Sequence, residues 1–115
     1  MTEITTLSDV EQFDAALEGS HRRPVWVFKH SLLCGISTRA WNQYRDFVDR
    51  SSRAEMDCTV VEIQRARPVS AAIAERTGIR HESPQAILLS MGRPVWHASH
   101  SGITTETLAE ATSRL

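Results

Sequence analysis

The chain of 115 residues has no long hydrophobic run and no large excess of charge of either sign. No stretch approaches the roughly 18 uninterrupted apolar residues that a membrane-spanning helix needs. Carboxylates are scattered through the first 17 residues, where a secretory signal peptide needs an apolar run. We therefore expect a cytoplasmic protein that does not insert into membranes.

Charge and cysteine content exclude two further classes of protein. The formal net charge at pH 7 is -1, which creates no field that attracts DNA, RNA or anionic lipid. Two cysteines, Cys34 and Cys58, are too few for a disulfide scaffold. The 41% hydrophobic and 23% charged residues are typical of a soluble domain, and there is no repeat or linker. We predict a single domain over residues 1–115 that does not bind nucleic acid.

The first part of the chain predicts a helix followed by a strand. Apolar residues recur at helical spacing over residues 7–17, with Ser8 and Glu11 as an expected capping box and Gly19 as an expected left-handed stop. Residues 24–29 are β-branched and aromatic without a helical period. This pattern is typical of a central strand that is buried on both faces.

Two more helices are expected on either side of a second strand. Apolar side chains repeat every four residues over 36–48, which indicates a long amphipathic helix. Residues 58–63 favour a strand. Pro68 suits the first turn of a third helix, which Gly78 closes.

The last part of the chain predicts a hairpin and a final helix. Residues 86–91 and 95–99 favour strands, and the short Gly92-Arg93-Pro94 connection requires them to be antiparallel. A helix follows Thr104. After the leading helix the order is β-α-β-α-β-β-α, with the first two strands parallel. This is the order of a thioredoxin fold, so we predict an α/β protein with a mixed four-stranded sheet flanked by helices.

Cys34 is the strongest candidate for chemistry. It lies just beyond the first strand, where the following helix begins. Unpaired N–H groups and the helix dipole stabilise a thiolate there, and Lys29 or His30 would add positive charge. Because the thiolate is the nucleophilic form of cysteine, we favour a reactive Cys34 over a solvent-facing cysteine without a role.

Ser37 and Cys58 make this a site with one thiol. Ser37 stands where a Cys-x-x-Cys motif has its second cysteine, and it also suits a residue that satisfies a backbone donor in the first helical turn. Both roles are compatible. Cys58 begins the second strand, at the opposite end of the sheet from Cys34, which is too far for a disulfide. We therefore expect Cys58 to be structural.

Ser83 and Pro84 immediately precede the third strand, where a proline that removes a ladder donor is tolerated at the first residue, so Pro84 also suits a residue that simply opens the strand. In thioredoxin-like folds a cis-proline at this point lies against the active thiol, so we predict a cis Ser83–Pro84 bond. His97 and His100 raise the question of zinc, but alternate strand residues point to opposite faces and no further Cys/His pair completes a four-ligand set. We predict no metal and no tightly bound cofactor.

Four segments of the chain are distinctive in combination: FKHSLLCGIS at 28–37, RP at 67–68, RHESPQ at 80–85 and WHASHSGIT at 96–104. Together they resemble the YtxJ-type monothiol bacilliredoxins, a thioredoxin-like family, in register over nearly the whole chain. The resemblance implies a cytoplasmic oxidoreductase that exchanges mixed disulfides with bacillithiol, the small thiol that some bacteria use in place of glutathione.

The resemblance also assigns residues by position. It implies that Cys34 is the active thiol, that Ser37 fills the resolving position and that Pro84 is the cis-proline. The supporting residues of the active site would be Lys29, His30, Gly35, Ile36 and Ser37, and those of the substrate groove Ser83, Pro84, His97 and His100.

Two departures from the family pattern bear on the thiol. The pattern is Thr-Thr-Cys-Pro-Ile-Ser, where this chain has Leu-Leu-Cys-Gly-Ile-Ser over 32–37. Leu33 removes a hydroxyl near the thiol, and Gly35 restores an N–H group that proline lacks.

The leading hypothesis is monothiol exchange, with bacillithiol as co-substrate and bacillithiolated client proteins as partners. In it, the Cys34 thiolate takes bacillithiol from the client and releases the repaired client thiol. The alternative is a thioredoxin-fold sensor or binding protein that is modified at Cys34 without turnover.

Overall fold

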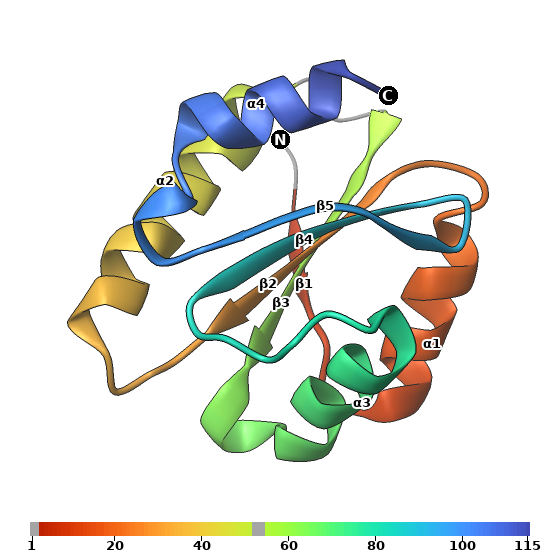
Figure 1. The fold of residues 1–115 in the computed structure, drawn as a ribbon, viewed down its shortest axis with the longest axis horizontal. Coiled ribbons are helices and arrows are strands. Elements are labelled where there is room, and N and C mark those ends of the chain that lie inside the picture. Colours follow the sequence, from red (N-terminus) through yellow and green to blue (C-terminus); the bar gives the residue numbers. More distant parts are fainter. Residues whose placement is uncertain (1–2, 52–54) are drawn as a thin grey trace.

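The strands of the chain build one sheet that helices cover on both faces (Figure 1). The computed structural model describes residues 3–51 and 55–115. Within these ranges the strands are β1 (Ile4–Thr6), β2 (Val25–His30), β3 (Asp57–Glu62), β4 (Gln85–Ser90) and β5 (Arg93–Ser99). The α-helices are α1 (Val10–Gly19), α2 (Gly35–Arg50), α3 (Arg67–Thr77) and α4 (Thr105–Ser113), and the 3-10 turns are η2 (Ile63–Arg65) and η3 (His100–Gly102).

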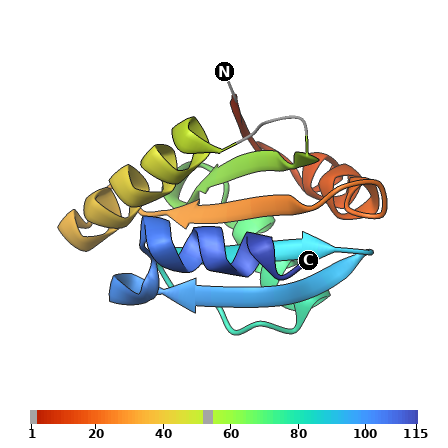
Figure 2. The same cartoon turned by 90° about the horizontal axis from the view of Figure 1, so that it is seen from above.

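The strands lie side by side in the order β1-β3-β2-β4-β5 (Figure 2). β3 runs parallel to both β1 and β2, whereas β4 is antiparallel to β2 and β5. β2 is therefore the central strand, and all its residues except His30 are buried. The predicted mixed α/β sheet with a buried central strand is confirmed.

The predicted number of strands is wrong, because the sheet of the described residues has five and not four. The additional strand, β1, precedes the leading helix and pairs with β3 from Ile4 opposite Cys58 to Thr6 opposite Val60. The Leu7 N–H group extends this pairing by donating to the Val60 carbonyl at 2.9 Å. An edge strand of three residues has no alternation that a sequence pattern can reveal, so only the partner strand defines it.

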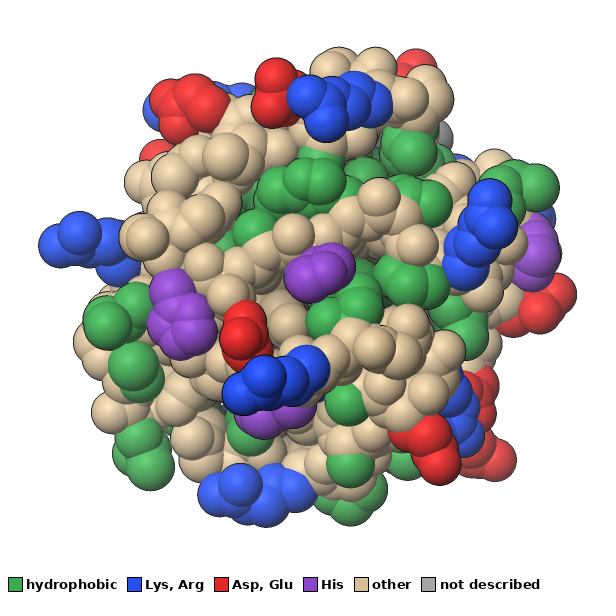
Figure 3. Space-filling model, in the orientation of Figure 1, with side chains coloured by type: hydrophobic (Ala, Val, Ile, Leu, Met, Phe, Trp, Pro, Cys, Tyr) green, Lys and Arg blue, Asp and Glu red, His purple; other side chains and the backbone are tan. Residues whose placement is uncertain are grey.

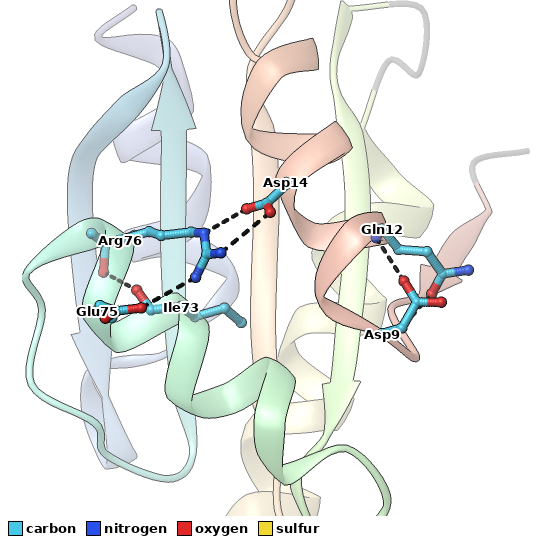
Figure 4. Close-up of polar contacts among 7 residues, drawn as sticks. Asp9, Gln12, Asp14, Ile73, Glu75 and Arg76 are labelled. Carbon is cyan, nitrogen blue, oxygen red and sulfur yellow. Dashed lines mark hydrogen bonds and ion pairs between the residues drawn. The ribbon is translucent and has the colours of Figure 1, made fainter.

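The ends of α1 also differ from the prediction. Asp9 is the N-cap, and it forms a capping box with Gln12 that lies one residue beyond the expected pair of Ser8 and Glu11 (Figure 4). Gly19 is the last helical residue and not a left-handed stop, because Ser20 caps the helix in a right-handed conformation. Leu7 precedes the helix and is buried in the core on the α1 and α3 face.

The predicted end of α3 at Gly78 is confirmed, but the β4–β5 connection is Met91-Gly92 and not the predicted Gly92-Arg93-Pro94. Gly78 ends α3 in the left-handed conformation with φ of 73°. The β4–β5 hairpin turns at Met91 and Gly92, where both φ angles are positive, at 57° and 81°. This two-residue turn matches the twist of an antiparallel pair, and it leaves Arg93 and Pro94 within β5.

Alternate residues of β2 feed two separate apolar cores, one on each face of the sheet. Trp26 and Phe28 pack with α2 and α4, whereas Val25 and Val27 pack with α1 and α3. Figure 1 shows the sheet between these two pairs of helices. An ion pair between Arg76 of α3 and Asp14 of α1, at 2.6 Å, joins the second pair (Figure 4).

Lys29 is a charged residue inside the core on the α1 and α3 face. Its side chain is fully buried, and its Nζ donates to the Ser70 carbonyl at 3.1 Å and lies 3.1 Å from His81 Nδ1. No described carboxylate forms an ion pair with it. Burial of the ammonium lowers the pKa of Lys29 from 10.5 to about 8.

This burial predicts that Lys29→Met stabilises the protein at pH 7. A pKa lowered from 10.5 to about 8 corresponds to about 3 kcal/mol of destabilisation by the charged form at neutral pH. Loss of the hydrogen bonds offsets about 1 kcal/mol of the gain, so we expect a net gain of about 2 kcal/mol in the free energy of unfolding.

The gain should shrink as pH rises from 8 to 10.5. In that window the unfolded chain binds more protons at Lys29 than the folded chain, so wild-type stability rises relative to the variant. Urea unfolding of both proteins at pH 7 and pH 10 measures the difference, in which titration of groups that do not interact with Lys29 cancels. An equal gain at both values would show that the effect comes from packing and not from charge.

Candidate functional site

Cys34 lies at the junction between the central strand and α2, as predicted. Its backbone is extended, with φ of -122° and ψ of 124°, and it is the N-cap residue of α2. The Thr38 N–H group donates to the Cys34 carbonyl at 3.2 Å, which closes the first helical turn. The cysteine is partly exposed. A thiolate here lies at the positive end of the helix dipole and is open to a second sulfur.

Ser37 holds this junction together. Its side chain is fully buried, and its Oγ accepts a hydrogen bond from the Ser31 N–H group at 2.9 Å. The same Oγ lies 2.8 Å from His30 Nδ1. The expected role of Ser37 in satisfying a backbone donor is therefore present, and the donor belongs to the loop that carries Cys34.

Gln64 anchors the loop from the other side, and sequence reasoning missed it. Its Oε1 accepts from the Leu32 N–H group at 2.9 Å, and its Nε2 donates to Ser31 Oγ at 2.9 Å. Gln64 lies in η2, just after β3. Because β2 and β3 are parallel, their carboxyl ends meet at one edge of the sheet, which is the only sequence signal that pointed to this position.

His30 belongs to the site as a neutral hydrogen-bonding group. Its ring stacks on Trp41 with a centroid distance of 5.3 Å. Burial lowers the pKa of His30, and the nearby Glu62 carboxylate only partly opposes this effect. Since Ser37 Oγ already accepts from Ser31, its hydroxyl can donate to an unprotonated His30 Nδ1. His30 therefore supplies hydrogen bonding rather than the positive charge that we expected.

Lys29 and His97 lie on the other face of the sheet, so their predicted roles near Cys34 are wrong. The ammonium of Lys29 points toward α3 and not toward α2. His97 pairs with Ile87, which packs with α1 and α3, whereas the neighbouring Trp96 packs with the α2 core. The physical reason is the alternation of side chains along a strand, which turns each of these residues away from the thiol.

A groove of about 1080 Å³ opens beside Cys34, between the start of α2 and the segment 100–104. Its rim is apolar, since the side chains of Leu33 and Ile36 are 84% and 56% exposed. Hydrophobic side chains gather at the left edge of the molecule in Figure 3, where α2 begins in Figure 1. The lining residues are Leu33, Cys34, Gly35, Ile36, Arg39, Ala40, Gln43, His100, Ser101, Ile103 and Thr104.

The predicted cis bond between Ser83 and Pro84 is present. The Pro84 carbonyl accepts a hydrogen bond at 3.1 Å from the N–H group of His100, which has a positive φ of 54°. Pro84 thus fixes the backbone of His100, which lines the groove, while Pro84 itself is buried. The Oγ of Ser83 is buried and has no hydrogen-bond partner among the described residues.

Cys58 is structural in its surroundings. Its side chain is 2% exposed, and burial raises the pKa of its thiol to about 12. It pairs with Trp26, near the start of β2, whereas Cys34 follows the end of that strand. Neither cysteine forms a disulfide.

The described part of the chain contains no group of three His, Cys, Asp or Glu side chains placed to hold a metal ion. Over the same residues, no helix combines the length and hydrophobicity that crossing a membrane requires.

Solved structures share this fold over nearly the whole chain. One, described as a candidate oxidoreductase with a thioredoxin fold, is 36% identical, with a TM-score of 0.83 over 94% of this chain and 92% of the other. The thioredoxin of Malassezia sympodialis is 16% identical, with a TM-score of 0.78 over 99% and 91% of the two chains. The thioredoxin of Fasciola hepatica is 14% identical, with a TM-score of 0.74 over 96% and 98%.

The predicted thioredoxin fold is therefore confirmed. A sequence profile of the family described as monothiol bacilliredoxin BrxC matches residues 5–108, which include Cys34, Ser37 and Pro84. The chain belongs to the monothiol bacilliredoxin BrxC family.

Proposed function

We propose that this protein is a monothiol oxidoreductase that uses Cys34 to exchange bacillithiol with client proteins. The observation that carries the proposal is the position of Cys34, partly exposed at the start of α2 and open to a groove. Family membership supports thiol chemistry at this position. Bacillithiol would be a co-substrate, bacillithiolated clients would be the partners, and the cytoplasm, where thiols are kept reduced, would be the site of action.

The exchange begins with attack of the Cys34 thiolate on the bacillithiol sulfur of a mixed disulfide. A new bond forms between the Cys34 sulfur and that sulfur as the bond to the client sulfur breaks. The client sulfur leaves with the electron pair and takes up a proton, so the client is reduced and Cys34 is oxidised to a mixed disulfide. A second small thiolate then attacks the bacillithiol sulfur of the adduct, the bond to the Cys34 sulfur breaks, and Cys34 leaves as a thiolate while the two small thiols depart joined as a disulfide.

The hydrogen-bonded position of Ser37 suits a cycle that uses one thiol. The Ser37 hydroxyl is committed to Ser31 and His30, and it supplies no sulfur to attack the adduct on Cys34. The mixed disulfide should therefore persist until an external thiol arrives. Pro84 supports the opposite wall of the groove through His100.

The first prediction for this function concerns the two cysteines. We expect Cys34→Ala to abolish removal of bacillithiol from a modified client, and Cys58→Ala to leave the exchange rate within about twofold of wild type. Cys58 is the matched control because its burial and a pKa raised to about 12 keep it a thiol at neutral pH. Intact mass of the client, sampled over time, measures the transfer.

Repeated repair of client molecules distinguishes the proposed enzyme from a sensor that is modified once at Cys34. With bacillithiol supplied in excess, each wild-type molecule should repair many client molecules. If Cys34 acquires a single bacillithiol adduct and no further client is repaired, the enzyme proposal fails and the sensor alternative stands.

The second prediction concerns Ser37→Cys. Two thiols at positions 34 and 37 can meet disulfide geometry across the start of a helix. After treatment with stoichiometric oxidised bacillithiol, wild type should carry the adduct, whereas the variant should lose the adduct and two hydrogens. Mass spectrometry of the intact proteins distinguishes these products. An adduct that survives equally long on both proteins would contradict the assignment of position 37 as the resolving position.

A further inference from the structure

The groove beside Cys34 carries an uneven distribution of charge. Its lining includes Arg39 and His100 but no carboxylate. Arg39 is exposed on α2, and within residues 3–51 and 55–115 no carboxylate forms an ion pair with it. A cation without a protein partner in a groove without acidic groups favours an anionic occupant.

A second cavity along the same helix differs in this respect. It has a volume of about 390 Å³ and is lined by Arg45 together with Asp49 and Glu62. The guanidinium of Arg45 therefore has carboxylates in its own cavity, whereas that of Arg39 has none. Both arginines lie on α2 and carry the same charge, so Arg45 is a matched control for Arg39.

Arg39 lies within reach of a group bonded to Cys34. It follows Cys34 by five residues, a rise of about 7.5 Å along a helix, and both residues line the same groove. The facing wall is fixed by two hydrogen bonds, from His100 N–H to the Pro84 carbonyl and from Thr105 N–H to Gln43 Oε1 at 3.0 Å. The groove therefore lies between the start of α2 and the segment 100–104, and hydrogen bonds hold the latter segment in place.

We infer that Arg39 binds a carboxylate of the small thiol that forms the mixed disulfide with Cys34, so that the groove selects anionic low-molecular-weight thiols. This inference rests on the proposed exchange at Cys34. The groove volume of about 1080 Å³ accommodates a small molecule and not merely a single sulfur substituent. Arg39 is then a specificity-determining residue that acts on the bound thiol and not on the sulfur atoms.

The reaction that reports this preference is a single exchange with a symmetrical disulfide. The Cys34 thiolate bonds to one sulfur of the disulfide, the sulfur–sulfur bond breaks, and the other half leaves as a thiolate with the electron pair. Cys34 is oxidised to a mixed disulfide, and the released half is reduced. No further oxidant is needed.

Three small disulfides test the inference: dithiodipropionate, which carries carboxylates, bis(hydroxyethyl) disulfide, which is neutral, and cystamine, which carries ammonium groups. For Arg39→Gln we expect the rate constant for adduct formation on Cys34 to fall about two- to fivefold with dithiodipropionate, the range of an exposed ion pair. The rate with the neutral disulfide should not change. For Arg39→Glu the preference should reverse in favour of cystamine.

Controls separate this inference from the function on which it rests. Arg45→Gln should leave all three rate constants unchanged, and added salt should weaken only the preference of wild type for the anionic disulfide. Equal effects of Arg39→Gln on all three disulfides, or no effect on any, would overturn the inference while leaving exchange at Cys34 intact. Failure of wild type to react with the neutral disulfide would instead count against the proposed function.

Discussion

The hydrogen bonds of the Ser37 hydroxyl are the interaction on which the rest of the site depends. They join the end of β2 to the first turn of α2, and the loop between these elements carries Cys34. Without them, a buried hydroxyl and the Ser31 N–H group would lack partners, which is costly inside a protein. Ser37 therefore has two effects. Its hydrogen bonds position the loop that carries Cys34, and its hydroxyl occupies the position where a second thiol would otherwise lie.

Alternate side chains of the central strand β2 point to opposite faces of the sheet. Phe28 and His30 point toward α2, where the aromatic packing around Trp41 and Tyr44 supports the site. Lys29, between them in the sequence, points to the opposite face and is buried there. Adjacent residues of β2 therefore contribute to different cores on the two faces of the sheet.

The antiparallel half of the sheet completes the site from the far side. β4 begins after the cis bond at Pro84, and β5 ends at η3, where His100 returns to the Pro84 carbonyl. This return brings the segment 100–104 against the start of α2, which creates the groove. Residues far apart in the chain, such as Arg39 and His100, therefore line one groove.

The local elements and the position of the reactive cysteine could be predicted from the order of residues. Apolar patterns and capping residues predicted the four α-helices and the four longer strands of the described residues, but not the 3-10 turns η2 and η3. The junction at Cys34 and the proline at position 84 were recognisable because their chemistry depends on local backbone position. The tertiary structure alone decided the rest. β1 is defined by its pairing with β3. Gln64 reaches the loop that carries Cys34 because parallel strands end at the same edge of the sheet. Lys29 and His97 turn away from Cys34 because neighbouring residues of a strand face opposite sides of the sheet. Contacts between distant segments set these features, and such contacts leave no periodic signal in the chain.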